Sequence, residues 1–198
     1  CIGISERTPP NTINALLPII FNEGFERIYA IDLPKCRSMM HLDTIFNCIN
    51  KNEIIVYPPL FLKDNSTTDS SILVHTIYPG QKLSESKQSK QNLFEIFQND
   101  GINMNPIKCG GNNILYQARE QWTDGANFFT IRPGLIIGYE CNKYTLESLE
   151  NSGYTCVSSE CFLKNVSKYE NKTKLIISIP NSELSRGRGG VRCLTLPL

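Results

Sequence analysis

The sequence predicts a mixed α/β fold in which a unit of two strands, a helix and a third strand occurs twice. Short apolar runs bounded by turn residues indicate the strands, and apolar side chains at three- and four-residue spacing indicate the helices. Because the same order of elements recurs, we expect a module repeated around an axis. The chain has 198 residues, of which 40% are hydrophobic and 20% charged, enough for a sizeable core.

The first part of the chain is expected to precede these units. Residues 1–4 (Cys-Ile-Gly-Ile) indicate a strand, and apolar residues over 13–20 recur at helical spacing until Gly24 ends the segment. Pro18 lies inside this helix and is expected to kink or shorten it. Residues 27–33 then predict a buried strand.

The first unit begins with expected strands at 44–49 and 53–57, and the polar residues between them indicate a hairpin. A helix is predicted over about 85–99, followed by Gly101 as its cap. A short strand over 103–108 completes the unit.

The second unit repeats this order. Strands are expected at 128–131 and 135–139, joined by an Arg-Pro-Gly sequence that suits a tight turn. A helix near 145–151 and a strand over 154–157 follow.

Four further segments complete the prediction. Residues 65–70 are expected to form a polar loop, and the Lys- and Asn-rich stretch 158–174 a surface insertion, after which 175–179 resumes a strand. Residues 192–196 are expected to end the chain as a short apolar strand.

Composition argues against several classes of function. A formal net charge of +1 gives no electrostatic case for nucleic acid or an anionic membrane, and no apolar run approaches the ~20 residues of a membrane span. Eight cysteines without a Cys-x-x-Cys pair favour free thiols over a disulfide framework or a zinc site. The chain starts at Cys1, so we infer a fragment, and we expect a reducing, cytoplasmic compartment.

A histidine and an aspartate stand at the entry to the expected strand at 44–49. If Leu42 points into the core, His41 and Asp43 face the same side by strand alternation. An imidazole beside a carboxylate can transfer a proton and hold a cation. The alternative, slightly favoured on these residues alone, is a pair that only stabilises the end of a strand.

The segment 185–193 (Ser-Arg-Gly-Arg-Gly-Gly-Val-Arg-Cys) combines three glycines, three arginines and a terminal cysteine. The glycines allow a ligand to approach the backbone closely, and the arginines offer forked donors to a carboxylate. Beside so much positive charge, Cys193 is expected to have a lowered pKa and to be partly thiolate. A phosphate-binding loop is the competing idea, but the Gly-Lys-Ser/Thr ending of such loops is absent.

These stretches, taken in order with three others, resemble arginine deiminases. The match spans nearly the whole chain, interrupted mainly by 158–174. The five motifs are Ser-Glu-Arg-Thr at 5–8, Met-His-Leu-Asp-Thr at 40–44, Gly-Gly-Asn at 110–112, Arg-Glu-Gln-Trp at 119–122 and Gly-Arg-Gly-Gly-Val-Arg-Cys at 187–193. Alone, the first of these would indicate only a surface salt bridge.

The resemblance implies a five-module α/β propeller of ββαβ modules, of which this chain would supply about half. Residues 1–198 would form the C-terminal part of one catalytic domain, and the N-terminal half would be missing. The reaction would convert L-arginine and water into L-citrulline and ammonia without metal or organic cofactor. Neither nucleic acid nor membrane is an expected partner, and assembly into a homo-oligomer stays open.

The resemblance also assigns roles to residues. Cys193 matches the nucleophile, His41 the acid–base residue and Asp43 a carboxylate that grips the guanidinium. Arg7 and Arg188, the latter beside Gly187, match arginines that recognise the substrate's α-carboxylate or belong to its loop. The glycines suggest that this loop opens to admit substrate and then closes.

Two other classes of function stay open at this point. An agmatine deiminase or an amidinotransferase of the same superfamily would share the chemistry, although agmatine has no carboxylate for an arginine to bind. A non-catalytic module could keep the fold, but the joint presence of Cys193, His41 and Asp43 disfavours it. A papain-like protease is disfavoured because its cysteine lies near the mature N-terminus.

Overall fold

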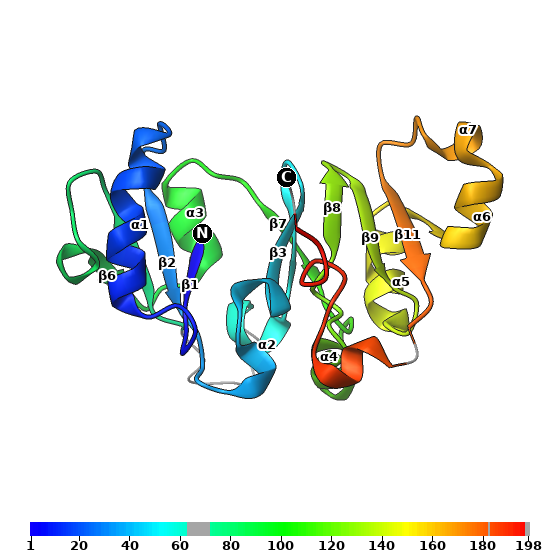
Figure 1. Cartoon of the computed structure of the whole chain (residues 1–198), viewed down its shortest axis with the longest axis horizontal. Coiled ribbons are helices and arrows are strands. Elements are labelled where there is room, and N and C mark those ends of the chain that lie inside the picture. The colour runs from blue at the N-terminus through cyan, green and yellow to red at the C-terminus, as the bar shows by residue number, and fades with distance from the viewer. Residues whose placement is uncertain (63–71, 182, 197–198) are drawn as a thin grey trace. The chain divides into compact units, whose positions relative to one another are not determined.

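The computed structural model describes residues 1–62, 72–181 and 183–196, and Figure 1 traces them from blue to red. The polar loop expected at 65–70 therefore lies outside the described residues. The chain divides into two compact parts, called unit 1 and unit 2 from here on, which are not the two repeated units predicted from the sequence. Unit 1 comprises Cys1–Leu42 and Pro59–Ile102, and unit 2 comprises Asp43–Pro58 and Asn103–Leu198. The predicted α/β class is confirmed, because both units combine sheets with helices.

Unit 1 contains a four-stranded sheet with the order β1-β2-β5-β6. β1 and β2 are parallel, and the remaining neighbours are antiparallel. The strands are β1 (Ile2–Ile4), β2 (Ile28–Asp32), β5 (Val74–Ile77) and β6 (Lys87–Ser89). Helix α1 (Pro10–Asn22) connects the two parallel strands, and its buried Ile13 and Leu17 pack into a core with Ile28 and Ile77. Spacing of four residues puts both side chains on one helix face.

The helix α1 passes through Pro18 and ends at Asn22, so Pro18 does not shorten it, and the alternative of a kink stays a prediction. Pro18 is exposed. The carbonyl that its missing N–H leaves unbonded can therefore be solvated, which lowers the cost of an internal proline.

The prediction of a helix over 85–99 is wrong for the first half of that range. Leu83–Glu85 form a 3-10 turn, Lys87–Ser89 form β6, and α3 spans only Leu93–Asn99. Asn92 starts this helix, because its side-chain oxygen accepts a hydrogen bond from the Phe94 amide at 2.8 Å. The cap at Gly101 is confirmed, with a φ of 77°.

Unit 2 contains the two predicted hairpins, each in its own sheet. The first sheet has the order β3-β4-β7 and the second β10-β11-β9-β8. In the first, β3 (Phe46–Asn50) and β4 (Glu53–Val56) are antiparallel, and β7 (Asn105–Lys108) joins β4 in parallel. In the second, β8 (Phe129–Arg132) and β9 (Leu135–Tyr139) form the hairpin.

The second sheet departs from a simple repeat of the first. The strand expected after its helix is β10 (Thr155–Ser158), but β11 (Leu175–Ile179) lies between β10 and β9, parallel to both. One core of unit 2 draws residues from both sheets and from the helix at 143–151. Its buried members include Ile49, Ile55, Ile107, Phe128, Ile136, Leu149 and Ile176.

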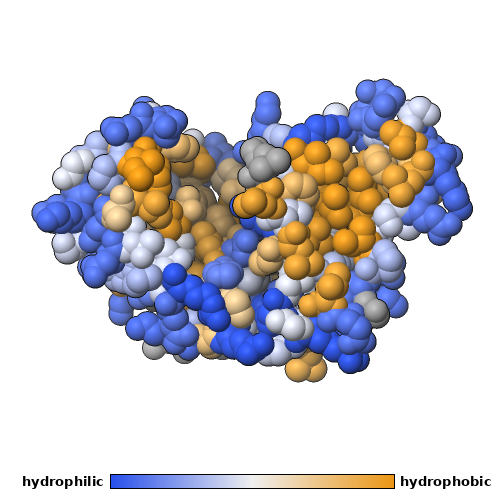
Figure 2. Space-filling view, in the orientation of Figure 1, coloured by the Kyte–Doolittle hydropathy of each residue, from blue (hydrophilic) through white to orange (hydrophobic). Residues whose placement is uncertain are grey.

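Helices complete unit 2. They are α4 (Ile114–Trp122), α5 (Lys143–Asn151), α6 (Ser159–Lys164) and α7 (Val166–Tyr169), and the short helix α2 (Pro58–Phe61) lies at the boundary of the units. The stretch expected as an insertion forms α6 and α7, whose Phe162 and Tyr169 pack on Leu175 and Ile177. Hydrophobic residues gather over β9 and β11 on the face shown in Figure 2. No helix among the described residues is long and apolar enough to cross a membrane.

Candidate active site

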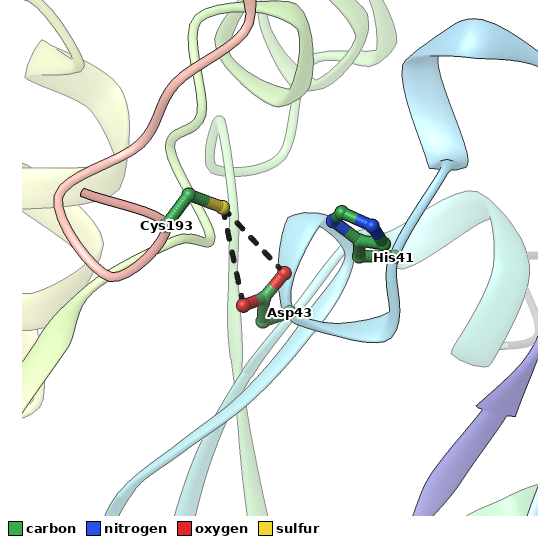
Figure 3. Close-up of side chains that lie close together, drawn as sticks. All are labelled: His41, Asp43 and Cys193. Atoms are coloured by element: carbon green, nitrogen blue, oxygen red, sulfur yellow. Dashed lines mark hydrogen bonds between the residues drawn. The ribbon is translucent and has the colours of Figure 1, made fainter. Parts of the chain in front are cut away.

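Asp43 lies in a 3-10 turn, Leu42–Thr44, and the strand β3 begins only at Phe46. The predicted strand alternation therefore does not apply to this segment. His41 stands two residues earlier, at the end of unit 1. A single residue separates it from Asp43 in the sequence, and Figure 3 draws both side chains.

Cys193 meets Asp43 within unit 2, as the dashed lines in Figure 3 show. Its sulfur lies 3.9 Å from Oδ1 and 4.0 Å from Oδ2 of that carboxylate. The residues are 150 positions apart in the sequence. Residues 191–194 form a turn, so the predicted terminal strand at 192–196 is wrong. A turn leaves Cys193 exposed, as a nucleophile that meets a substrate must be.

Asn127 connects the two segments through one side-chain amide. Its Oδ1 accepts a hydrogen bond from the Cys193 backbone N–H at 3.1 Å. Its Nδ2 donates to the Asp43 backbone carbonyl at 3.2 Å. Asn127 is 1% exposed, so neither bond competes with bulk water. The buried amide thus fixes the spacing between the cysteine and the aspartate.

The Asn127 side chain lies so close to the backbone at position 190 that only glycine fits there. A Cβ on Gly190 would lie 2.2 Å from Asn127 Oδ1, too close for any side chain. The neighbouring Gly189 accepts a hydrogen bond from the Tyr139 hydroxyl at 2.7 Å through its carbonyl oxygen. These contacts anchor the loop just before Cys193. At Gly187, by contrast, an added Cβ would meet open space.

Arg188 is turned into unit 2. Its side chain and that of Asp124 are each 2% exposed, with Nη2 and Oδ1 3.5 Å apart. Its Nη1 donates to the carbonyls of Gln121 and Trp122, and its guanidinium lies 5.1 Å from the Trp122 ring centroid. Arg188 adopts the left-handed backbone conformation, with a φ of 63°, whereas the three glycines of the loop do not. Recognition of a substrate carboxylate by Arg188 stays a prediction, and it would require this side chain to leave Asp124.

The predicted lowering of the Cys193 pKa is wrong. Desolvation raises the pKa of this thiol, and the negative charge of Asp43 raises it further, against smaller opposing effects of hydrogen bonds from Gly190 and Asn127. Each arginine of the loop has an acidic partner that offsets its charge. Arg186 pairs with Glu183 at 3.0 Å, Arg188 with Asp124, and Arg192 Nε with Asp43 at 3.3 Å.

Two of the five motifs support the scaffold. Glu120 is 1% exposed and accepts hydrogen bonds from the Tyr144 and Thr145 amides and the Thr145 hydroxyl, which satisfies the start of α5. Gly110 has a φ of 73°, and a Cβ there would lie 2.3 Å from the Gln117 Cα. Glu120 thus caps a helix, and Gly110 allows a close backbone approach.

Arg7 belongs to unit 1, so the geometry of unit 2 does not test its role. It is exposed in a turn that follows β1. The Ser5 hydroxyl accepts hydrogen bonds from the backbone amides of Arg7 and Thr8, each at 3.2 Å, which closes this turn.

Sequence reasoning missed Asp124 and Asn127. Both lie in the Thr-Asp-Gly-Ala-Asn stretch that directly follows the motif at 119–122. The signal available was the concentration of turn-forming polar residues after a helix. Asp124 adopts a φ of 61°, a conformation that aspartate tolerates better than most residues.

The fold and the site define an α/β protein that holds a thiol against a carboxylate, with an imidazole two residues from that carboxylate. The arginine deiminase family model matches residues 1–198, so the chain belongs to the arginine deiminase family. Among curated relatives, it is 34% identical to an arginine deiminase of Mycoplasma capricolum, covering 100% of this chain and 43% of the relative. The arginine deiminases of Latilactobacillus sakei and Listeria monocytogenes are 33% and 32% identical, with the same coverage. The chain thus spans less than half the length of these relatives.

Proposed function

We propose that this chain carries the nucleophile and the acid–base residue of an enzyme that hydrolyses L-arginine to L-citrulline and ammonia. The observation that supports this most directly is the Cys193 sulfur lying 3.9 Å from the Asp43 carboxylate. A guanidinium held by that carboxylate would present its carbon to the sulfur. Membership of the arginine deiminase family supports the choice of substrate.

Asp43 would bind the guanidinium through charge-assisted hydrogen bonds. The Cys193 sulfur then forms a bond to the guanidinium carbon, and the bond from that carbon to one terminal nitrogen breaks. His41 supplies the proton with which this nitrogen leaves as ammonia. The product of this half-reaction is an S-alkylthiouronium attached to Cys193.

Water completes the reaction. Its oxygen bonds to the same carbon while His41 takes one of its protons, and the carbon–sulfur bond breaks to leave the thiolate. The second proton of the water is lost to the ammonia or to solvent as the carbonyl of L-citrulline forms. The balance is one arginine and one water consumed, and one citrulline and one ammonia formed. No metal or organic cofactor takes part in these steps.

The substrate's own charge would help the thiol to ionise. In the free chain the Asp43 carboxylate raises the pKa of Cys193. A bound guanidinium cation neutralises this carboxylate and places positive charge beside the sulfur, which favours the thiolate. The nucleophile would therefore form chiefly when substrate is present.

We further propose that the chain supplies about half of a five-module propeller and needs a second half of the same protein for catalysis. Family acids that lie upstream of position 1 would grip the other side of the guanidinium. Exposed apolar side chains such as Ile19 and Phe25, at 60% and 59% exposure, would suit an incomplete assembly.

Citrulline formation tests these proposals. We expect no robust turnover by the purified chain alone, and turnover after addition of the N-terminal half of a curated relative. Robust turnover by the chain alone would contradict the need for a second half. Agmatine in place of arginine tests the rival substrate, and faster turnover of agmatine would overturn the proposed one.

A further inference from the structure

A pocket lies in unit 1, and its lining contains no residue of unit 2. It has a volume of about 470 Å³, within the range of small-molecule sites, ~300–1,000 Å³. Its lining comprises Ile4, Ser5, Glu6, Pro9, Pro10, Asp32, Lys35, His75 and Leu83. The reaction proposed above uses none of these residues.

The sheet register brings the pocket's central residues to one face. Ile4 of β1 pairs with Asp32 of β2, and His75 of β5 pairs with Ala30, two residues before Asp32. Because side chains two apart on a strand share a face, Asp32, Ile4 and His75 project on the same side. Pro10 starts α1 on this side and, lacking an N–H, removes one of the donors with which a helix start binds anions.

His75 is 8% exposed, and its hydrogen bonds fix its tautomer. The Ser86 hydroxyl donates to the Leu83 carbonyl at 2.6 Å, so its oxygen must accept from His75 Nδ1, 2.9 Å away. The proton is then on Nδ1, and Nε2 carries a lone pair. Among the described residues only Nδ1 of this ring makes a hydrogen bond, and the ring lines the pocket.

The polar groups of the pocket are mostly acceptors. Burial lowers the pKa of His75, against a smaller opposing effect of Asp32, which favours the neutral ring. Glu6 and Asp32 add two carboxylates against the single ammonium of Lys35. Ile4, Pro9 and Leu83 supply an apolar wall. Such a surface suits a donor-rich cation with a short aliphatic chain.

We propose that this pocket is a second ligand site that binds a small aliphatic cation, an ammonium or a guanidinium. Its nitrogen donates to the Asp32 and Glu6 carboxylates and to His75 Nε2. Its alkyl chain lies along Ile4 and Leu83. The proposal does not depend on the reaction at Cys193.

Nuclear magnetic resonance of the histidine rings tests the proposal, because the chain has only two histidines, His41 and His75. The chain, labelled at histidine, is titrated with n-butylguanidinium, alone and in complex with an unlabelled N-terminal half of a curated relative. His41→Gln assigns the two signals. We expect a saturable shift of the His75 signal with n-butylguanidinium, and none at equal concentrations of neutral n-butylurea or anionic n-butyrate.

Variants locate the contact. Asp32→Asn and Glu6→Gln keep shape and remove one charge each, and each should weaken binding about tenfold or more, as for the loss of a charge-assisted hydrogen bond. Glu26→Gln removes the same charge from an exposed residue outside the lining and should stay within about twofold. Unchanged affinity in both pocket variants, a shift confined to His41, or equal binding of n-butylurea or n-butyrate would overturn the proposal.

Discussion

The surroundings of Cys109 and Cys193 in unit 2 differ in how completely their polar groups are satisfied. Cys109 is 0% exposed in the core, with its sulfur 3.6 Å from the Thr145 hydroxyl oxygen, and burial raises its pKa to about 12. Cys193 stands on an exposed turn against Asp43. The first thiol is held protonated by its surroundings, whereas the second depends on a charge that a ligand can neutralise.

The neighbouring carboxylates differ in the same way. Glu120, near Cys109, accepts three hydrogen bonds from the start of α5. Asp43 has an ion pair with Arg192, which is exposed, and the weak contact with the Cys193 sulfur. A carboxylate whose lone pairs are not all used in hydrogen bonds can bind a ligand. The smaller number of hydrogen bonds to Asp43 therefore distinguishes the candidate site from the scaffold around Glu120.

The largest effect is expected from removing the reactive thiol. With the N-terminal half present, Cys193→Ser should reduce citrulline formation at least about 10³-fold, because a serine hydroxyl stays protonated where a thiol ionises. Cys109→Ala is the matched control and should retain most of the activity. Mass spectrometry after an arginine-like inactivator should place the adduct on Cys193. An adduct on Cys109 or Cys36 would refute the assignment of the nucleophile.

The next largest effect concerns the carboxylate beside that thiol. Asp43→Asn keeps the shape but removes the charge that we propose binds the guanidinium. We expect kcat/KM for arginine to fall about 100-fold or more, since a charged hydrogen bond is worth ~1.5–3 kcal/mol and the transition state relies on it further. A change within about twofold would mean that Asp43 only supports its turn.

Removing the Glu120 carboxylate, which accepts three hydrogen bonds, should lower the stability of the fold. Glu120→Ala leaves two amides and a hydroxyl buried without their acceptor, so we expect the free energy of unfolding to fall by about 2–4 kcal/mol. Glu147→Ala, on the exposed side of the same helix α5, should change it by less than about 0.5 kcal/mol. Denaturant titrations measure both. Equal effects would show that the capping bonds contribute little.

The smallest effect is a shift in the pH at which Cys193 reacts. Because the Asp43 charge raises the pKa of this thiol, Asp43→Asn should move the midpoint of its alkylation by iodoacetamide to lower pH. Cys109 should stay unreactive at neutral pH in both proteins. A midpoint that moves upward would contradict the role given to the Asp43 charge.

Local patterns in the sequence predicted elements well where turn residues bound them. The hairpin of β3 and β4 and the strand β11 were predicted within two residues of their bounds. The element predictions that failed are those in which a distant contact or a local helix cap decides the structure. Asn92 starts α3 later than apolar periodicity alone suggests, and the C-terminal turn is held by Asn127, far away in the chain.

The candidate site was predictable in its residue types but not in its electrostatics. Cys193 and Asp43 are found from their motifs, and the structure brings them together. The arginines around Cys193 predicted a lowered pKa, because their acidic partners Asp124 and Asp43 lie 64 and 149 residues away from Arg188 and Arg192. Pairing at such distances cannot be read from local sequence.

Asn127 gives the C-terminal loop a cooperative mode of opening. One amide holds both the Cys193 N–H and the Asp43 carbonyl, so rotating that side chain breaks both hydrogen bonds in a single event. The loop should therefore open as a whole instead of fraying residue by residue from its end. The rate at which the Cys193 amide exchanges its hydrogen for deuterium would then report the opening of the entire segment.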